Sequence, residues 1–211
     1  MRKMLIFILL LAFLACQKKE NAATLPVYNQ ANFTPLWLSK KEMETDTIHR
    51  IADFSFQNQL GETVTNAQLD GKIYVANFIF TICPSICPKM QDNLDLVQKT
   101  FATDPSVLLV SHTVMPWVDS VAQLKSYGQK RNIDPKKWQL LTGDAGKIYD
   151  LARKSYFAEE EIGYAKDSTE FLHTEHVLLI DGKRRLRGVY NGTLPLEIER
   201  LIEDIKVLKR E

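Results

Sequence analysis

The chain has 211 residues, of which 45% are hydrophobic and 25% charged, and its formal net charge is +1. This length allows one domain with extra segments and a single hydrophobic core of ordinary size. The first fifteen residues carry Arg2 and Lys3 and no acid, so the remainder holds 25 basic and 26 acidic side chains. A balance so close to neutral gives no electrostatic indication of nucleic-acid binding.

The N-terminus has the features of an export signal. Arg2 and Lys3 precede an apolar run over residues 4–15, which is shorter than the roughly 20 residues that a membrane-spanning helix needs. The run ends at Cys16 before a polar stretch, and this junction resembles the lipobox of bacterial lipoproteins. The resemblance implies that Cys16 is lipidated and becomes the first residue of the mature protein. A cleaved signal peptide and an uncleaved short anchor are the alternatives.

The cysteine count supports lipidation. The chain has three cysteines, and an odd number leaves one of them unpaired in an exported protein. Lipidation of Cys16 leaves two, Cys83 and Cys87, which are close enough in sequence to act together. The odd number is then explained.

Three segments follow from these patterns. Residues 1–15 form a lipoprotein-type signal peptide, residues 16–45 a polar tether without sustained periodicity, and residues 46–211 one folded domain. We therefore expect the protein to be exported and anchored to a membrane on the periplasmic side as a lipoprotein.

The domain alternates predicted strands and helices. Residues 58–61 predict a hairpin turn after the alternating Phe54 and Phe56. Residues 72–80 are nearly all apolar and rich in β-forming types, so we place this strand at the sheet centre, covered on both faces. In chain order, the remaining predictions are a helix that starts at Pro88, strand 107–113, helix 120–130, strand 138–141, helix 145–154, strand 176–181, strand 185–190 and helix 195–208. This order describes an α/β fold with a mixed sheet flanked by helices.

The strongest local signal lies between the central strand and the next helix, where residues 81–88 read Thr-Ile-Cys-Pro-Ser-Ile-Cys-Pro. Thiols at a strand end and in the first turn of a helix are partly exposed. The helix N-terminus stabilises the thiolate, which is the nucleophile and the metal ligand. Three residues between Cys83 and Cys87 give a wider bite than Cys-x-x-Cys, which suits metal coordination as well as disulfide formation. We predict a redox-active pair; a structural disulfide or a buried structural pair is the alternative.

The metal and its third ligand are inferred from the ligand types. A structural zinc site normally has four protein ligands, whereas Cys83, Cys87 and one histidine are the three that fit. Two soft thiolates with one imidazole favour copper, especially Cu(I). His173 enters the apolar strand at residues 176–181, and in thioredoxin-like folds the segment entering the equivalent strand faces the cysteine loop. His173 is therefore the better-placed ligand, and His176 is interpreted as a strand residue.

Other polar side chains are expected to have ordinary roles. We expect His112 to be a strand-end histidine with its hydrogen bonds satisfied, and His49 to be solvated. The charge run Lys-Arg-Arg at residues 183–185 is interpreted as a solvated surface.

The Cys-Pro-x-x-Cys-Pro loop, the His-Thr pair at residues 173–174 and the Leu-Ile pair at 179–180 together resemble the SCO (SenC) family of copper chaperones, from about Ile51 onward. The resemblance implies a thioredoxin-like fold, with copper bound by the two loop cysteines and one downstream histidine. In that family the histidine stands a fixed number of residues before a strand that ends in Leu-Ile. Counting back from residues 179–180 therefore selects His173 and not His176. The family often has an aspartate where this chain has Met115, which we expect to serve in packing rather than in metal binding.

The function that this resemblance implies is that of a metallochaperone, which helps to assemble the dinuclear copper centre of cytochrome c oxidase. Reduced Cys83 and Cys87 would bind copper, and their oxidation to a disulfide would switch binding off. The expected partners are the copper-receiving subunit of the oxidase, a thiol reductant protein and the membrane. The alternatives are a thiol-disulfide reductase that keeps copper-site cysteines reduced, and a peroxidase or redox sensor. Thiol oxidoreductases carry a cis-proline where this chain has Glu175, which makes general disulfide exchange the weaker hypothesis.

Overall fold

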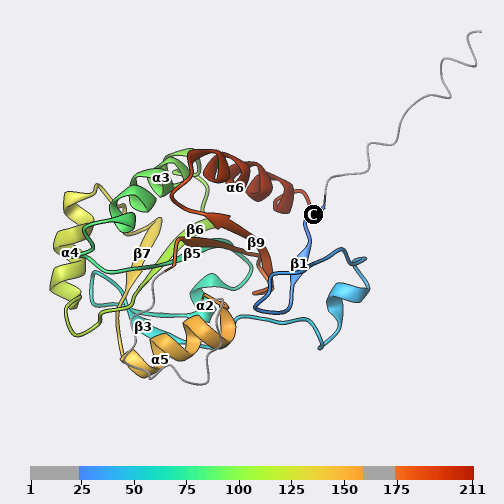
Figure 1. Cartoon of the computed structure of the whole chain (residues 1–211), viewed down its shortest axis with the longest axis horizontal. Coiled ribbons are helices and arrows are strands. Elements are labelled where there is room, and N and C mark those ends of the chain that lie inside the picture. Colours follow the sequence, from blue (N-terminus) through green and yellow to red (C-terminus); the bar gives the residue numbers. More distant parts are fainter. Residues whose placement is uncertain (1–23, 159–173) are drawn as a thin grey trace, which may run out of the picture.

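The computed structural model describes residues 24–158 and 174–211, which contain a central five-stranded sheet (Figure 1). In spatial order, its strands are β7 (Trp138–Leu141), β6 (Val107–Thr113), β5 (Ile73–Ile79), β8 (His176–Ile180) and β9 (Leu186–Asn191). Strands β5, β6 and β7 are parallel, whereas β8 runs antiparallel to β5, and β9 runs antiparallel to β8. All seven residues of β5 are buried, so the prediction of a central strand is confirmed.

Both faces of the sheet are covered, because successive side chains of β5 point to opposite faces. Tyr74 and Phe78 join one hydrophobic cluster, and Val75 and Ile79 join the other. On the face of Val75 pack the helices α3 (Ile86–Thr100), α4 (Val121–Lys130) and α6 (Pro195–Leu208). On the face of Tyr74 pack α5 (Ala145–Asp150) and the hairpin of β3 (Ser55–Gln57) and β4 (Thr63–Thr65), which α2 (Asn66–Leu69) follows. Figure 1 shows these two layers, and the predicted α/β fold is confirmed.

Local signals set most of the element ends. Ser120 caps α4, because its side chain accepts a hydrogen bond from an N–H of the first turn. Helix α3 begins at Ile86, two residues before the predicted start at Pro88. Pro88 fits in the first turn, because a proline there forfeits no intrahelical hydrogen bond. The helix expected over residues 145–154 is α5 followed by a π-helical turn at Leu151–Ser155.

Residues 24–45, which the sequence predicted as tether, pack against the domain. Two short strands, β1 (Val27–Tyr28) and β2 (Pro35–Leu36), pair antiparallel, and a 3-10 turn follows at Glu42–Glu44. The side chains of Val27 and Met43 are buried. The guanidinium of Arg187 in β9 donates to the carbonyl oxygens of Leu25 and Pro26 at 2.7 and 2.9 Å. Residues 24–45 of the expected tether therefore belong to the folded unit. The sequence did not indicate this, because the carbonyl oxygens of Leu25 and Pro26 bind Arg187 whatever their side chains are, and such contacts produce no periodic pattern.

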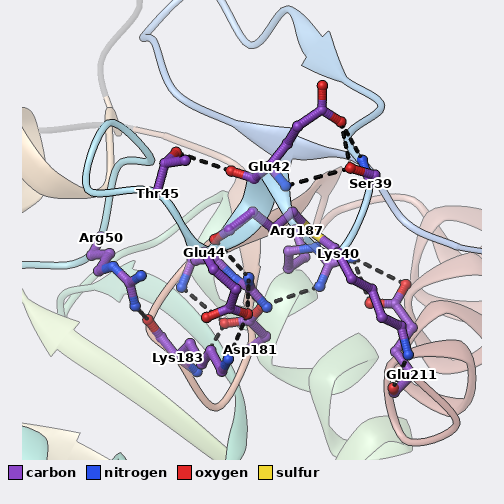
Figure 2. Close-up of polar contacts among 12 residues, drawn as sticks. Ser39, Lys40, Glu42, Glu44, Thr45, Arg50, Asp181, Lys183, Arg187 and Glu211 are labelled. Atoms are coloured by element: carbon purple, nitrogen blue, oxygen red, sulfur yellow. Dashed lines mark hydrogen bonds and ion pairs between the residues drawn. The ribbon is translucent and has the colours of Figure 1, made fainter.

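The charge run at residues 183–185 is only partly a solvated surface. Figure 2 shows Asp181 and Lys183 in a group of polar contacts at this end of the sheet. The Lys183 side chain is half exposed, but Arg185 is 7% exposed and its Nε donates to the Asp181 carboxylate at 2.7 Å. The interpretation is wrong for Arg185, because the acid four residues earlier neutralises its charge and permits burial.

Some predicted features lie outside the described residues. These are the signal peptide at residues 1–15, the lipidated Cys16 and the third ligand His173. Over residues 24–158 and 174–211, no helix is long and apolar enough to cross a membrane. The lipidation of Cys16 and the metal role of His173 therefore stay predictions.

Candidate metal-binding site

The two cysteines lie in the turn between β5 and α3, as the sequence predicted. The Cys83 N–H donates to the Phe80 carbonyl at 3.2 Å, which closes a tight turn directly after the central strand. Ser85 then takes φ −122° and ψ −97°, outside helical geometry, and α3 begins at the next residue. Cys87 therefore lies in the first turn of α3, where N–H groups have no intrahelical partner and favour negative charge.

The two sulfur atoms are shielded and in contact with each other. Cys83 is 9% exposed and Cys87 is 4% exposed, and both are free thiols. The Cys87 N–H donates to the Cys83 Sγ at 3.5 Å, and the Cys87 thiol donates a hydrogen bond to the same sulfur. Met115 packs against the hydrophobic cluster that contains both cysteines. Two sulfurs in hydrogen-bond contact can both reach one small metal ion.

Hydrogen bonds divide the pair into two different thiols. Burial raises the pKa of Cys83, but hydrogen bonds from the N–H of Ser85, from the Cys87 thiol and from the N–H groups of Cys87 and Ile86 outweigh it, so this pKa lies below the ordinary value. Burial, together with the hydrogen bond that Cys87 donates to Cys83, raises the pKa of Cys87 to about 12. Cys83 is therefore the thiol that ionises first, and Cys87 keeps its proton until a metal displaces it.

A buried carboxylate supports the start of the cysteine loop. Asp119 lies between β6 and α4, is fully buried, and accepts hydrogen bonds from the hydroxyl groups of Thr81 and Thr113. No sequence pattern predicts this role for Asp119, because its contact with Thr81 joins positions 38 apart in the chain. The local signal available was an acid directly before Ser120, the cap of α4.

His112 differs from the expectation of a satisfied strand-end histidine. It is fully buried, and neither ring nitrogen has a hydrogen-bond partner within the structure described. Its ring is stacked on Phe78 at 5.6 Å and meets Phe54 and Phe56 edge-on. The expectation that its hydrogen bonds are satisfied is therefore wrong. Burial lowers the pKa of His112 to about 3, so the imidazole is neutral at pH 7.

The third predicted ligand cannot be placed, since His173 lies outside the described residues. His176 begins β8, with its ring edge-on to Phe33 at 5.4 Å, which fits the expected strand residue. Among the described residues, no group of three or more His, Cys, Asp or Glu side chains is arranged to hold a metal ion. The structure thus brings together Cys83 and Cys87 and leaves the third ligand untested.

Comparisons with known protein families and curated proteins give one consistent result. A family model described as SCO1/SenC matches residues 42–210. A SCO1 protein homolog of Bacillus subtilis (strain 168) is 31% identical over 160 residues, which cover 75% of this chain and 82% of that protein.

Solved structures are similar over the same part of the chain. A SCO1/SenC family lipoprotein from Bacillus anthracis str. Ames matches with a TM-score of 0.67 and 29% identity, over 76% of this chain and 95% of that one. BsSco, described as a member of the Sco family of cytochrome c oxidase assembly proteins with a disulfide switch, matches with a TM-score of 0.63 and 27% identity, over 76% and 94% of the two chains. Copper-bound ScoI of Bradyrhizobium japonicum matches with a TM-score of 0.56 and 26% identity, over 74% and 98%.

Proposed function

This chain belongs to the SCO1/SenC family, and from that premise we propose that it binds copper through Cys83 and Cys87 and delivers it to the dinuclear copper centre of cytochrome c oxidase. The observation that carries the proposal is the hydrogen-bonded pair of thiols at the start of α3. Thiolate sulfur is the preferred protein ligand of Cu(I). The copper-bound structure of the Bradyrhizobium relative supports copper as the cargo.

His173 is the proposed third ligand. Strand β8 runs antiparallel to β5, with Leu178 opposite Ala76, so β8 begins at the end of the sheet where β5 leads into the cysteine loop. His173 precedes the first residue of β8, His176, by three positions in the sequence. This topology supports a ligand that arrives from the strand next to the thiols.

The redox state of the pair is the proposed gate. Metal binding needs thiolates, so oxidation of Cys83 and Cys87 to a disulfide removes two ligands at once. The oxidation forms one S–S bond and releases two protons and two electrons, and a partner disulfide accepts them when it is reduced to two thiols. The disulfide switch reported for BsSco supports a gate of this kind.

A thiol-disulfide reductase is the second candidate, favoured by the difference between the two thiols. Cys83, with its lowered pKa, would attack a partner disulfide, and Cys87 would resolve the mixed disulfide. The variant His173→Ala separates the two functions. It should weaken copper binding strongly under the chaperone proposal and leave reduction of a test disulfide unchanged under the reductase proposal.

We also propose that residues 1–15 are a signal peptide and that lipid on Cys16 anchors the protein on the periplasmic side of a membrane. The pattern at Cys16 and the lipoprotein from Bacillus anthracis, similar over 76% of this chain, support this placement. The proposed partners are then the copper-receiving subunit of the oxidase and a protein that reduces the thiol pair.

Copper transfer tests the proposed function. The reduced protein, loaded with one equivalent of Cu(I), is mixed without oxygen with the metal-free copper-receiving domain of the oxidase, and the copper content of each is measured after separation. We expect copper on the recipient, and none transferred by Cys83→Ser. Uptake by the recipient that is no greater than from buffered Cu(I) alone would contradict the proposal.

A further inference from the structure

Asp119 is a buried carboxylate whose contacts are all with neutral groups among the described residues. Its Oδ1 accepts from the Thr81 hydroxyl at 2.6 Å, and its two oxygens accept from the Thr81 N–H at 3.3 and 3.2 Å. Its Oδ2 also accepts from the Thr113 hydroxyl. A buried charge is expensive unless it is hydrogen-bonded on every side, so the fold keeps this carboxylate against a substantial desolvation cost.

The pattern of donors explains why the residue is an acid. Both oxygens of Asp119 receive hydrogen bonds, and only a carboxylate accepts at both positions. An asparagine would present an NH2 group to one of the donors from Thr81 or Thr113. Aspartate therefore accepts from both threonines as they stand, whereas asparagine would need a threonine hydroxyl to turn and accept from its NH2 group.

Asp119 acts at the point where the cysteine loop leaves the sheet. The last main-chain bond between β5 and the chain after β6 is the one from the Val114 N–H to the Ile79 carbonyl, at 2.8 Å. Beyond it, Thr81 is held by Asp119 and by Gln123 of α4, whose Nε2 donates to the Thr81 hydroxyl at 2.9 Å. Cys83 follows Thr81 by two residues, so these side-chain bonds set where the first thiol begins its turn.

We propose that Asp119 is a positioning residue, which acts through Thr81 to hold Cys83 at metal-binding distance from Cys87. This inference rests on the proposed copper-binding function. Cys87 is fixed by α3, whereas Cys83 lies in the turn before it, so the separation of the sulfurs depends on the anchorage of the turn. A ligand pair held in its binding geometry loses less conformational freedom when the metal binds.

The test compares Asp119→Asn and Thr81→Val with a control at the other end of the sheet. Asp181→Asn is the matched control, because Asp181 is also a buried carboxylate but bonds Arg185 and Arg187. We expect Asp119→Asn and Thr81→Val each to lower Cu(I) affinity about tenfold. The double variant should lose little more, since both changes break the same link. Asp181→Asn should lower the melting temperature and leave Cu(I) affinity unchanged.

A metal-free readout separates this inference from the proposed function. The alkylation rates of Cys83 and Cys87 by a neutral reagent report how well the loop is held. In wild type the two rates should differ, and in Asp119→Asn and Thr81→Val they should converge as the turn loosens. If wild type binds no Cu(I), the proposed function fails and the alkylation rates still decide the role of Asp119.

The inference is overturned if the folded Asp119→Asn protein keeps both the wild-type Cu(I) affinity and the wild-type ratio of alkylation rates. It is also overturned if Asp181→Asn changes either quantity as much as Asp119→Asn does, because the effect would then be one of general stability. If Asp119→Asn does not fold, Thr81→Val, which keeps the carboxylate and nearly the same side-chain volume, decides by the same two measurements.

Discussion

The two ends of the central sheet are held together by different chemistry. At the thiol end, Asp119 is buried among neutral donors next to the cysteine loop. At the opposite end, Asp181 bonds the guanidinium groups of Arg185 and Arg187 at 2.7 and 3.0 Å, and Arg187 also bonds Glu211 at 2.7 Å (Figure 2). The charges at the ionic end neutralise one another, whereas the thiol end holds a carboxylate bonded to neutral donors and two cysteines whose thiolates would bind a cation. That difference suits a metal site at one end and a structural junction at the other.

Hydrogen bonds tie the N-terminal segment, residues 24–45, to the C-terminal residue Glu211. The Leu25 N–H donates to the Glu211 carboxylate at 2.8 Å, and the Lys40 ammonium donates to the main-chain oxygen of Glu211 at 3.2 Å. Leu25 and Lys40 therefore join the domain at the ionic end, beside the C-terminus (Figure 1), whereas Phe33 of the same segment contacts His176 at the start of β8. Strand β5 separates the two ends by on the order of 20 Å. The cysteine loop and Leu25 thus lie at opposite ends of the sheet.

Breaking the ionic end should have the largest effect on stability. In Arg187→Leu, the carboxylates of Asp181 and Glu211 lose a guanidinium partner. The carbonyl oxygens of Leu25 and Pro26 lose a hydrogen-bond donor. Removing one member of a buried ion network costs about 3–5 kcal/mol, and urea unfolding at neutral pH measures it. Cu(I) affinity should not change while the protein stays folded. A loss of copper affinity in step with the loss of stability would show that the two ends are not independent.

His112 should make stability depend on pH below about pH 6.5. Its ring packs on Phe78, which belongs to the hydrophobic cluster that contains both cysteines. The pKa of His112 is about 3 in the folded protein, against 6.5 for an ordinary histidine, so the unfolded chain binds a proton that the folded protein does not. Stability is then full above pH 6.5 and falls as the pH drops from 6.5 toward 3, by at most about 1.4 kcal/mol per pH unit.

The variant His112→Phe isolates this contribution, because a phenylalanine fits among Phe54, Phe56 and Phe78 without titrating. Urea unfolding of both proteins between about pH 4.5 and about pH 7.5 gives the two slopes. The wild-type free energy of unfolding should rise with pH more steeply than that of His112→Phe. Equal slopes would mean that His112 has the same pKa in the folded and the unfolded protein, and would contradict the account.

An exposed tryptophan at each end allows the two ends to be compared as contact surfaces. Trp117 lies in the loop after β6 and is 62% exposed, and Trp37 lies in the N-terminal segment and is 67% exposed. Since β5 and β6 are parallel, with Ile79 opposite Thr113, Trp117 and the cysteine loop lie at the same edge of the sheet. Trp117→Ser should slow copper transfer to the recipient about tenfold, as the loss of an aromatic contact does, without changing Cu(I) affinity. Equal slowing by Trp37→Ser would argue against a docking surface at the thiol end.

The smallest effect is expected from an exposed ion pair at the ionic end. Lys183 bonds Glu44 at 2.6 Å, but both side chains are about half exposed. Lys183→Ala should therefore leave the free energy of unfolding almost unchanged, because solvent screens an exposed pair, in the same urea experiment as Arg187→Leu. A loss as large as that of Arg187→Leu would mean that burial does not distinguish the two cations.

The sequence predicted those parts of the fold in which local pattern and burial agree. The continuous apolar run of β5 identified the central strand, and β6 has the predicted ends because its burial is also continuous. Strand β7 also has the predicted ends, and three of its four residues are buried. The cysteine pair was found from its spacing and its position between a strand and a helix. The softness of the ligands favoured copper and the family resemblance supported it, whereas the choice of His173 over His176 depended on the resemblance.

The missed features depend on contacts between distant parts of the chain. Asp119 acquires its role from Thr81, 38 residues away, and Arg187 from carbonyl groups more than 160 residues away. Neither contact leaves a periodic signal in the sequence. His112 was misjudged for a related reason, since the aromatic rings that surround it come from three different strands or loops.

The central claim is that Cys83 and Cys87 bind one copper ion together, and anaerobic Cu(I) titration against a competing chelator tests it most directly. Reduced wild type should bind one Cu(I) per chain. Cys83→Ala and Cys87→Ala should each lose about hundredfold or more in affinity, because a single thiol cannot replace the chelating pair. Wild type that loses all Cu(I) to the chelator, or alanine variants that bind as tightly as wild type, would contradict the claim.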